Sequence, residues 1–467
     1  MKRRHPCFDF DTNYFMELSN PMTLKSIFME LPRAASFGWH SVNRIRQTAG
    51  VLGKTGLYWA LGDRLPAPVL LRRTFERLGA TYIKIGQLIA SSPSLFPGAY
   101  VKEFQRCLDQ TEPVSFKYME NILKKELGPH YIPDIFSHVD ETPLASASIA
   151  QVYAARLSTG EDVVIKIQRP GVETILATDL NTLYLAAVML EKLVPRLKHA
   201  SLAGILSEIR RTVLEECDFI KESENIEIFS KFLDGIGNSD VVTPKVYHQA
   251  SSRRVLTMER LYGTPLTRRE QLFKASQNPY RILGAAFETW MDSITKCELF
   301  HADLHAGNIL ILDDGRVGFI DFGIVGRISG KTRDGVQSLI KAMMVMDYQT
   351  MAESMLTIGM TRKKVDTARL AKDLEYFYLS LESPPPDEDM AFAVSDLPEP
   401  DQTLLEIVRI AETHGIRFPR EFTLLLKQFL YFDSYRDIVF EMAGADMEGL
   451  MDDFISKMEG LDPTLLQ

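Results

Sequence analysis

The sequence contains few cysteines, the residues that cross-link small extracellular folds through disulfide bonds. Four cysteines occur in 467 residues, at positions 7, 107, 217 and 297, and no two of them form a C-x-x-C pair. This spacing argues against a disulfide framework and against a structural zinc site. The cysteine usage fits a reducing, intracellular setting.

Long apolar runs are also missing. No stretch reaches the ~18 uninterrupted apolar residues that a membrane-spanning helix requires, and the run that begins at Leu183 is broken by Glu191 and Lys192. The basic start, Lys2-Arg3-Arg4, is not followed by the apolar core of a signal peptide. We therefore expect a cytoplasmic chain that is not secreted and has no transmembrane segment.

The net charge is negative. The chain has 53 basic and 62 acidic residues, a formal charge of −9, which argues against nucleic acid as a partner. Residues 1–79 have the opposite balance, with twelve basic and six acidic side chains. A basic front end is typical of peripheral contact with an anionic membrane surface, and an unevenly charged solvated surface explains it equally well.

The composition is that of a globular protein, with 45% hydrophobic and 25% charged residues. The periodicity predicts an α+β architecture with two lobes. Apolar residues from Leu71 to Ile89 predict one amphipathic helix, and a long helical stretch is expected over 171–234, interrupted near Pro195. Short strands are expected around the turn at 159–162, at 241–242 and 254–258, and at 309–312 and 317–320. We divide the chain into a basic helical segment, a helical extension, a strand-rich part and a helical part, at 1–69, 70–135, 136–262 and 263–467.

The strongest chemical signal is the loop from His301 to Asn308, followed by Asp321-Phe322-Gly323 after a short hairpin. An aspartate, an asparagine five residues later and a second aspartate are the groups that phosphoryl transfer from a nucleotide requires. In this interpretation Asp303 is the catalytic base, while Asn308 and Asp321 bind Mg²⁺ through oxygen. His301 supports the loop by hydrogen bonding.

A different interpretation of the same loop is a metal site. His301, Asp303 and His305 form an H-x-D-x-H pattern that resembles metallohydrolase loops. A zinc or iron site would need further histidine ligands. The chain has only nine histidines, and no second cluster of this kind occurs. The phosphoryl-transfer interpretation is therefore favoured.

A small-residue loop upstream has the spacing of a phosphate-binding loop. The protein-kinase pattern G-x-G-x-x-G-x-V occurs here with alanine in place of every glycine, at Ala145, Ala147, Ala150 and Val152. Alanine resists the positive φ that glycine permits, so we expect nucleotide binding in an altered geometry. Lys166 stands fourteen residues after Val152, where a kinase places its phosphate-binding lysine. The expected nucleotide contacts are Ala145, Ala147, Ser148, Ala150, Val152, Lys166 and Glu259.

Two further sets of polar residues could complete this site. A lysine buried between lobes requires a carboxylate, and Glu222, on the helix expected to carry Glu215 and Asp218, is the favoured partner of Lys166. On the helix at 71–89, Lys84 and Gln87 fall opposite the apolar stripe. Such residues are most often simply solvated, and the small neighbours of Lys84 make a functional role equally plausible.

These motifs together resemble the UbiB/AarF family of atypical kinases. The resemblance rests on Lys84-Ile85-Gly86-Gln87, the alanine loop, the segment 164–171, Glu216-Cys217-Asp218-Phe219 and the loop 301–308, in that family's order. It implies a protein-kinase-like fold, with a strand-rich N-lobe at 136–262, a helical C-lobe at 263–467, and the helical extension packed over the nucleotide cleft.

The resemblance also implies roles for individual residues. Lys84 and Gln87 would occupy the place of a peptide substrate, Glu216 and Asp218 would face them, and Glu222 would pair with Lys166. The implied ligands are ATP or ADP and Mg²⁺. The implied role is in the synthesis or handling of isoprenoid quinones such as ubiquinone, with a lipid or quinone intermediate and quinone-biosynthesis proteins as partners.

Three functions remain open on the sequence alone. The leading one is an ATP-dependent kinase or ATPase that acts on a lipid. A protein substrate is disfavoured, because no Ala-Pro-Glu motif follows Gly323 and the helical pattern resumes near Thr332, which leaves little chain for docking a peptide. The second is a nucleotide-sensing scaffold without turnover. The third is a small-molecule kinase of the aminoglycoside or choline type.

Overall fold

The computed structural model describes residues 46, 50–51, 65–90, 98–104, 112–193, 202–268, 279–359, 361, 364–382 and 400–443. Most of the predicted basic segment 1–69 lies outside these residues. The chain divides into two compact units. Unit 1 contains the described residues up to Ile220 together with Tyr247–Thr257, and unit 2 contains Lys221–Val246 and the described residues from Met258 onward.

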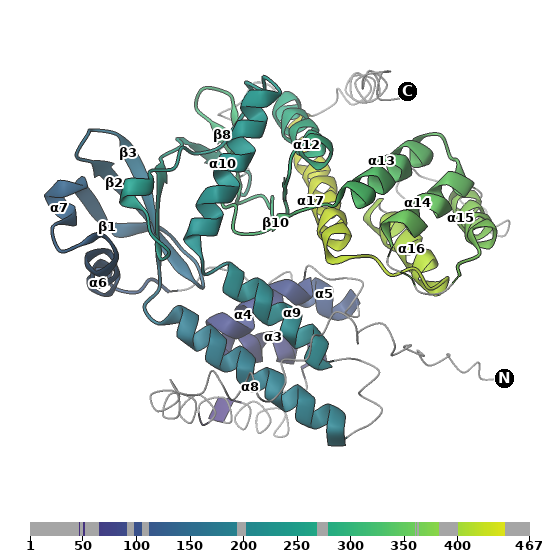
Figure 1. Cartoon of the computed structure of the whole chain (residues 1–467), viewed down its shortest axis with the longest axis horizontal. Coiled ribbons are helices and arrows are strands. Elements are labelled where there is room, and N and C mark those ends of the chain that lie inside the picture. Colours follow the sequence, from purple (N-terminus) through teal and green to yellow (C-terminus); the bar gives the residue numbers. More distant parts are fainter. Residues whose placement is uncertain are drawn as a thin grey trace. The chain divides into compact units, whose positions relative to one another are not determined.

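Unit 1 combines a helical group with an antiparallel sheet (Figure 1). Its helices are α3 (Ala67–Leu78), α4 (Ala80–Ala90), α5 (Gly98–Phe104), α6 (Phe116–Leu127), α7 (Tyr131–Asp134), α8 (Val172–Leu193) and α9 (Leu202–Glu215). Its strands are β1 (Phe136–Ser146), β2 (Ala150–Leu157) and β3 (Asp162–Gln168), and the 3-10 helix η3 spans His248–Ala250. The sheet order is β1-β2-β3-β5, where β5 (Val255–Glu259) continues into unit 2.

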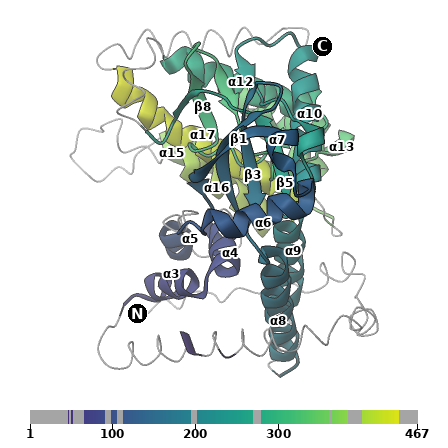
Figure 2. The ribbon, with the colours of Figure 1, turned by 90° about the vertical axis from the view of Figure 1, so that its left-hand side faces the viewer.

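The sheet of unit 1 follows from apolar alternation and turn residues. Strands β2 and β3 form the hairpin that the sequence predicts, with Gly160 at a φ of 106° in its turn. Side chains of the sheet and of α6 enclose a core that includes Met119, Leu123, Tyr153 and Ile165, all fully buried. Helices α8 and α9 run side by side, with α4 in contact with both (Figure 2).

Two predicted helices are divided in the structure. The helix predicted from Leu71 to Ile89 is interrupted at Gly79, whose φ of 94° ends α3 before α4 begins. The predicted helical stretch over 171–234 is broken again after Glu215, and α10 (Phe219–Gly235) starts only after a turn. The turn is held because the Gln168 amide donates to the carbonyl of buried Cys217 and the Phe219 N–H donates to the carbonyl of Arg253. Glu215 and Glu222 therefore do not share one helix.

Unit 2 is mainly helical and contains a four-stranded sheet and a separate two-stranded sheet. Its helices are most of α10, then α12 (Pro279–Lys296), α13 (Gly330–Met344), α14 (Tyr348–Ile358), α15 (Thr367–Glu382), α16 (Pro400–Thr413) and α17 (Arg420–Ala443). Its strands are β4 (Val241–Val242), β6 (Gly263–Pro265), β7 (Phe300–His301), β8 (Ile309–Leu312), β9 (Val317–Phe319) and β10 (Val325–Gly326). The sheet order is β4-β9-β8-β6, and β7 pairs with β10 separately.

The short strands predicted from the sequence are confirmed, including the β8–β9 hairpin around Gly315. The mixture of helix and sheet confirms the α+β prediction. Within the part of the chain that the structure describes, no helix combines the length and apolar character needed to cross a bilayer.

Candidate functional site

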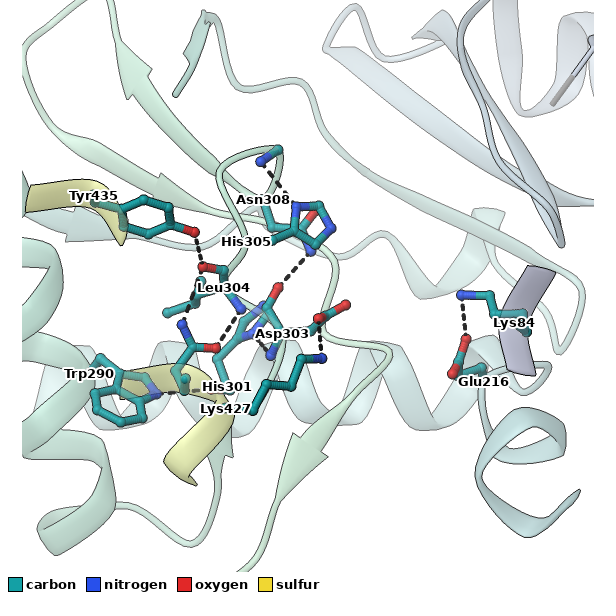
Figure 3. A network of polar contacts seen from close by, with 12 residues as sticks. Lys84, Glu216, Trp290, His301, Asp303, Leu304, His305, Asn308, Lys427 and Tyr435 are labelled. Atoms are coloured by element: carbon teal, nitrogen blue, oxygen red, sulfur yellow. Dashed lines mark hydrogen bonds and ion pairs between the residues drawn. The ribbon is translucent and has the colours of Figure 1, made fainter. Parts of the chain in front are cut away.

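The loop that joins β7 to β8 carries two of the predicted site residues, Asp303 and Asn308 (Figure 3). The backbone carbonyl of Asp303 accepts hydrogen bonds from the Asn308 side chain at 2.9 Å and from the backbone N–H of His305 at 2.8 Å. The backbone N–H of Asn308 in turn donates to the carbonyl of His305. These bonds close the loop on itself, so that Asp303 and Asn308 have fixed relative positions.

His301 is fully buried, and its ring contacts the backbone of this loop. Its Nδ1 accepts from the backbone N–H of Asp303, and its Nε2 lies 3.1 Å from the carbonyl oxygen of Ile320. A carbonyl can only accept, so Nε2 carries the proton and the ring is neutral. Burial lowers the pKa of His301 to about 4, which keeps this tautomer at neutral pH. Both ring nitrogens are therefore used by the backbone.

This arrangement removes the metal-site interpretation of His301, Asp303 and His305. The Nδ1 atom of His305 accepts from the backbone N–H of Gly307, so this ring is also engaged within the loop. Among the residues that the structure describes, no cluster of three or more His, Cys, Asp or Glu side chains has the geometry of a metal site. The favoured interpretation of the loop does not need such a cluster.

Asn308 and Asp321 lie at the same end of the β8–β9 hairpin. Ile309 pairs with Phe319, and the backbone N–H of Ile320 donates to the carbonyl of Asn308 at 3.0 Å. Asp321 follows directly and has a φ of 62°, a left-handed conformation that aspartate tolerates better than most residues. Strained backbone of this kind often occurs at functional sites.

The Asp-Phe-Gly segment is anchored from several sides. Phe322 is fully buried, with its ring 4.6 Å from His301 and 5.2 Å from Phe229 of α10, measured between centroids. The side chain of Asn225, also on α10, donates to the carbonyl of Phe322 at 3.1 Å. This contact of Asn225, three residues after Glu222, is not predicted by the sequence pattern.

Glu222 belongs to this part of unit 2. It is buried, and a Cβ placed on Gly323 would lie 4.0 Å from its Oε2 atom and 3.2 Å from Oδ1 of Asp321. Its carboxylate is thus close to the Asp-Phe-Gly segment. The predicted pair of Glu222 with Lys166 joins residues of different units and stays a prediction.

In unit 1 the alanine loop and Lys166 occupy neighbouring strands. Lys166 is buried on β3, opposite Val152 of β2, with Nζ 5.3 Å from the centroid of the Phe219 ring. The loop between β1 and β2 is closed by a bond from the Ala147 N–H to the carbonyl of Ala150. Among the described residues only Asp321 and Met346 are non-glycine positions with positive φ, so no alanine of this loop takes that conformation.

Arg169 holds the alanine loop through hydrogen bonds that the sequence pattern does not predict. Its guanidinium donates to the carbonyl of Ala147 and to the Oγ of Ser146, each at 2.8 Å. Its backbone N–H donates to the carbonyl of Ile149. The loop is thus tied to the residue that follows β3. In the sequence, Arg169 stands just after the lysine-bearing strand, inside the segment 164–171 on which the family resemblance rests.

The remaining predicted residues lie on α4, on the α9–α10 turn and at the end of β5. Nζ of Lys84 lies 2.9 Å from Oε2 of Glu216, with both side chains largely buried. The Gln87 side chain is half-buried on the same helix. Asp218 accepts from the N–H of Ile220 and lies 3.8 Å from Arg253. Glu259 is exposed and accepts from the backbone N–H of Lys245.

Helix α17 supplies residues to the catalytic loop that the sequence analysis did not identify. Lys427 lies 2.8 Å from Oδ1 of Asp303, and Gln428 and Tyr435 bond to the backbone of Leu304. Lys427 and Gln428 could have been noticed in the sequence, because they interrupt an otherwise apolar helical segment, Leu424-Leu425-Leu426-Lys427-Gln428-Phe429. Polar side chains at such positions are usually buried with a partner.

Comparisons with known proteins identify the family of this chain. Residues 106–355 match the family described as the ABC1 atypical kinase-like domain. An uncharacterized chloroplastic aarF domain-containing protein kinase of Arabidopsis thaliana is 46% identical, over 79% of this chain and 72% of the relative. An uncharacterized protein of Mycobacterium tuberculosis is 32% identical over 88% of this chain and 81% of the relative.

A third relative is named for an activity. The chloroplastic Arabidopsis thaliana protein called Activity of BC1 Complex Kinase 7 is 30% identical, over 77% of this chain and 50% of the relative. The family match and the sequence identities point to the same family. This chain belongs to the ABC1 atypical kinase-like family, the UbiB/AarF group that its motifs resemble.

Proposed function

We propose that this protein is an atypical kinase or ATPase that uses ATP and Mg²⁺ to phosphorylate or mobilise an isoprenoid lipid, such as an intermediate of quinone synthesis. The observation that carries the proposal is the arrangement of the β7–β8 loop and the β8–β9 hairpin. In this arrangement the Asn308 side chain donates to the carbonyl of Asp303, and the N–H of Ile320, the residue before Asp321, donates to the carbonyl of Asn308. Phosphoryl transfer depends mainly on positioning of this kind.

The residues present suit a magnesium ion. Because the Asn308 amide nitrogen donates to the carbonyl of Asp303, the amide oxygen is the atom that can bind a cation, and Asp321 adds a carboxylate. Oxygen donors of these two kinds are what Mg²⁺ prefers. A bound Mg²⁺ would neutralise charge on the phosphate oxygens. Asp303 would orient the attacking hydroxyl or water and accept its proton.

A non-protein substrate is supported by the short connection after the Asp-Phe-Gly segment. Only residues 324–329 separate Gly323 from α13, and residues 325–326 of these form β10. Protein kinases use a longer segment here to dock a peptide. The lipid assignment rests on the motif resemblance, as do quinone-biosynthesis proteins as partners. Peripheral membrane contact rests on the basic front end at residues 1–79.

The test is Mg²⁺-dependent release of phosphate from ATP by the purified chain, with and without vesicles that contain an isoprenoid quinone precursor. We expect turnover that Asp321→Asn abolishes, because asparagine keeps the left-handed backbone accessible and removes only the charge. Asp314→Asn is the matched control, since Asp314 is exposed in the turn of the same hairpin. Unchanged turnover in Asp321→Asn would contradict the proposal.

The alanine loop favours a second candidate, a nucleotide-sensing scaffold without turnover. None of its residues takes the positive φ that glycine-rich loops use, and Arg169 restrains it further. A scaffold of this kind would show an increase in melting temperature with ATP or ADP but no phosphate release. Phosphate release with a lipid would reject it, while phosphorylated amines or sugars in a screen of soluble compounds would favour a small-molecule kinase.

A further inference from the structure

Helix α17 approaches the catalytic loop with one defined face. Lys427, Tyr431 and Tyr435 are spaced four residues apart, so they lie along the same side of the helix, and Gln428 lies next to Lys427. All four residues belong to unit 2, as does the loop. More than a hundred residues of chain separate this helix from Asp303 and Leu304.

Gln428 and Tyr435 fix the position of this face relative to the loop. The amide of Gln428 accepts from the N–H of Leu304 at 2.8 Å and donates to its carbonyl at 3.2 Å. The Tyr435 hydroxyl donates to the same carbonyl at 2.6 Å, and burial raises the pKa of Tyr435, which keeps that proton in place. The backbone of Leu304, the residue after Asp303, is therefore held by three hydrogen bonds with α17.

From this position on α17, Lys427 forms an ion pair with Asp303 (Figure 3). Its Nζ lies 2.8 Å from Oδ1 of Asp303 and 5.2 Å from the centroid of the Tyr431 ring. The Lys427 side chain is 9% exposed and that of Asp303 is 22% exposed. A buried ammonium group requires a carboxylate or an aromatic face to offset its lost hydration, and Lys427 has both.

The catalytic loop itself has no lysine. Many serine and threonine kinases carry a lysine two residues after the catalytic aspartate, and this chain has His305 there. The Nδ1 atom of His305 is engaged by the N–H of Gly307. In the part of unit 2 that the structure describes, Lys427 brings to Asp303 the positive charge that the loop sequence lacks.

We propose that Lys427 is a positioning residue for phosphoryl transfer, which holds the Asp303 carboxylate in its working orientation and replaces the lysine that is missing from the loop. The inference rests on the proposed function and adds to it a residue outside the kinase motifs. An ordered carboxylate with a cation at one oxygen does not have to reorganise when the acceptor hydroxyl or water arrives. Charge-assisted bonds of this length also restrict the carboxylate strongly.

The test compares three substitutions at one position. Lys427→Met keeps most of the volume without the charge, Lys427→Arg keeps the charge, and Lys427→Ala leaves room for a small amine. We expect Lys427→Met to lower kcat for ATP turnover at least about tenfold while KM for ATP changes by less than about twofold. Lys427→Arg should retain more activity than Lys427→Met, and methylammonium should partly restore Lys427→Ala.

The matched control is Lys372→Met, because Lys372 is exposed on α15. It should leave kcat unchanged. A merely structural role of Lys427 predicts neither rescue by methylammonium nor a selective loss of kcat. Full activity in Lys427→Met, or a change confined to KM, would overturn the inference.

A second measurement separates this inference from the proposed function. Urea unfolding of Lys427→Met, Asp303→Asn and the double variant forms a double-mutant cycle, and we expect the two substitutions to be non-additive. Turnover in the unmodified protein together with additive unfolding effects would overturn the inference alone. Absence of turnover in the unmodified protein, with non-additive unfolding, would confirm the pair but reject both the proposed function and a role for Lys427 in it.

Discussion

The Nε2 atom of His301 lies 3.1 Å from the carbonyl oxygen of Ile320, the residue that precedes Asp321. Since Nδ1 of the same ring accepts from the Asp303 N–H, one neutral imidazole joins the catalytic loop to the Asp-Phe-Gly segment. The pKa of His301 is lowered to about 4 by burial, whereas an unfolded histidine titrates near pH 6.5.

We therefore predict that the protein loses stability as the pH falls below about 6.5. Between that pH and the folded pKa the unfolded chain binds more protons, so the free energy of unfolding decreases as pH decreases. The full contribution is on the order of 3 kcal/mol and is complete near pH 4. Urea unfolding at a series of pH values measures it. His301→Gln cannot titrate, so a pH dependence identical in variant and wild type would contradict this account.

Phe322 should be important for stability as well as for the position of Asp321. It is fully buried against His301 and Phe229, so Phe322→Ala should cost about 3–5 kcal/mol through lost contact and a cavity. Phe322→Leu, which keeps part of the volume, should cost less. Equilibrium unfolding in urea measures both values. A loss below about 1 kcal/mol in Phe322→Ala would show that the ring is not packed as described.

The Lys84–Glu216 pair should behave as a buried ion pair. Removal of either charge alone, in Lys84→Met or Glu216→Gln, should destabilise the protein by about 3–5 kcal/mol, because the remaining charge stays buried without its partner. The double variant should lose much less than the sum of the two. The control is the exposed pair Arg156–Asp162, whose loss should cost about 1 kcal/mol or less. Additive losses at Lys84 and Glu216 would argue against a coupled pair.

Position 326 is predicted not to tolerate any residue larger than glycine. A Cβ at this position, on the strand that pairs with β7, would collide with the ring of Phe300. Gly326→Ala should therefore cost about 1–3 kcal/mol of unfolding free energy through overpacking. Gly330→Ala is the control, since a Cβ there meets nothing within 4 Å and alanine should stabilise the start of α13 by about 0.4–1 kcal/mol. Equal melting temperatures for the two variants would contradict this prediction.

Local patterns predicted much of what the structure contains. The β2–β3 and β8–β9 hairpins follow from alternating apolar residues around glycine turns, and the loop from His301 to Asn308 follows from its spacing. Helix breaks were less visible. Gly79 is tolerated inside an amphipathic period. The turn at Cys217 depends on a hydrogen bond from the Gln168 amide and on one from the Phe219 N–H to the carbonyl of Arg253, and both Gln168 and Arg253 are distant in sequence.

The supports of the site were the hardest part to predict. Gln428 and Lys427 contact residues 124 positions earlier in the chain, and no periodicity of either segment encodes that contact. Arg169 was equally hidden, because its hydrogen bonds go mainly to backbone carbonyls, which carry no sequence signature.

The hydrogen bonds between α17 and Leu304 also limit where a recombinant chain can be truncated without disturbing the catalytic loop. The match to the kinase-like family ends at residue 355, well before α17. A recombinant fragment trimmed to that match would retain Asp303, Asn308 and Asp321 but lose the scaffold that holds the peptide after Asp303. Expression of the matched segment alone should yield a protein with an intact motif and a misshapen loop.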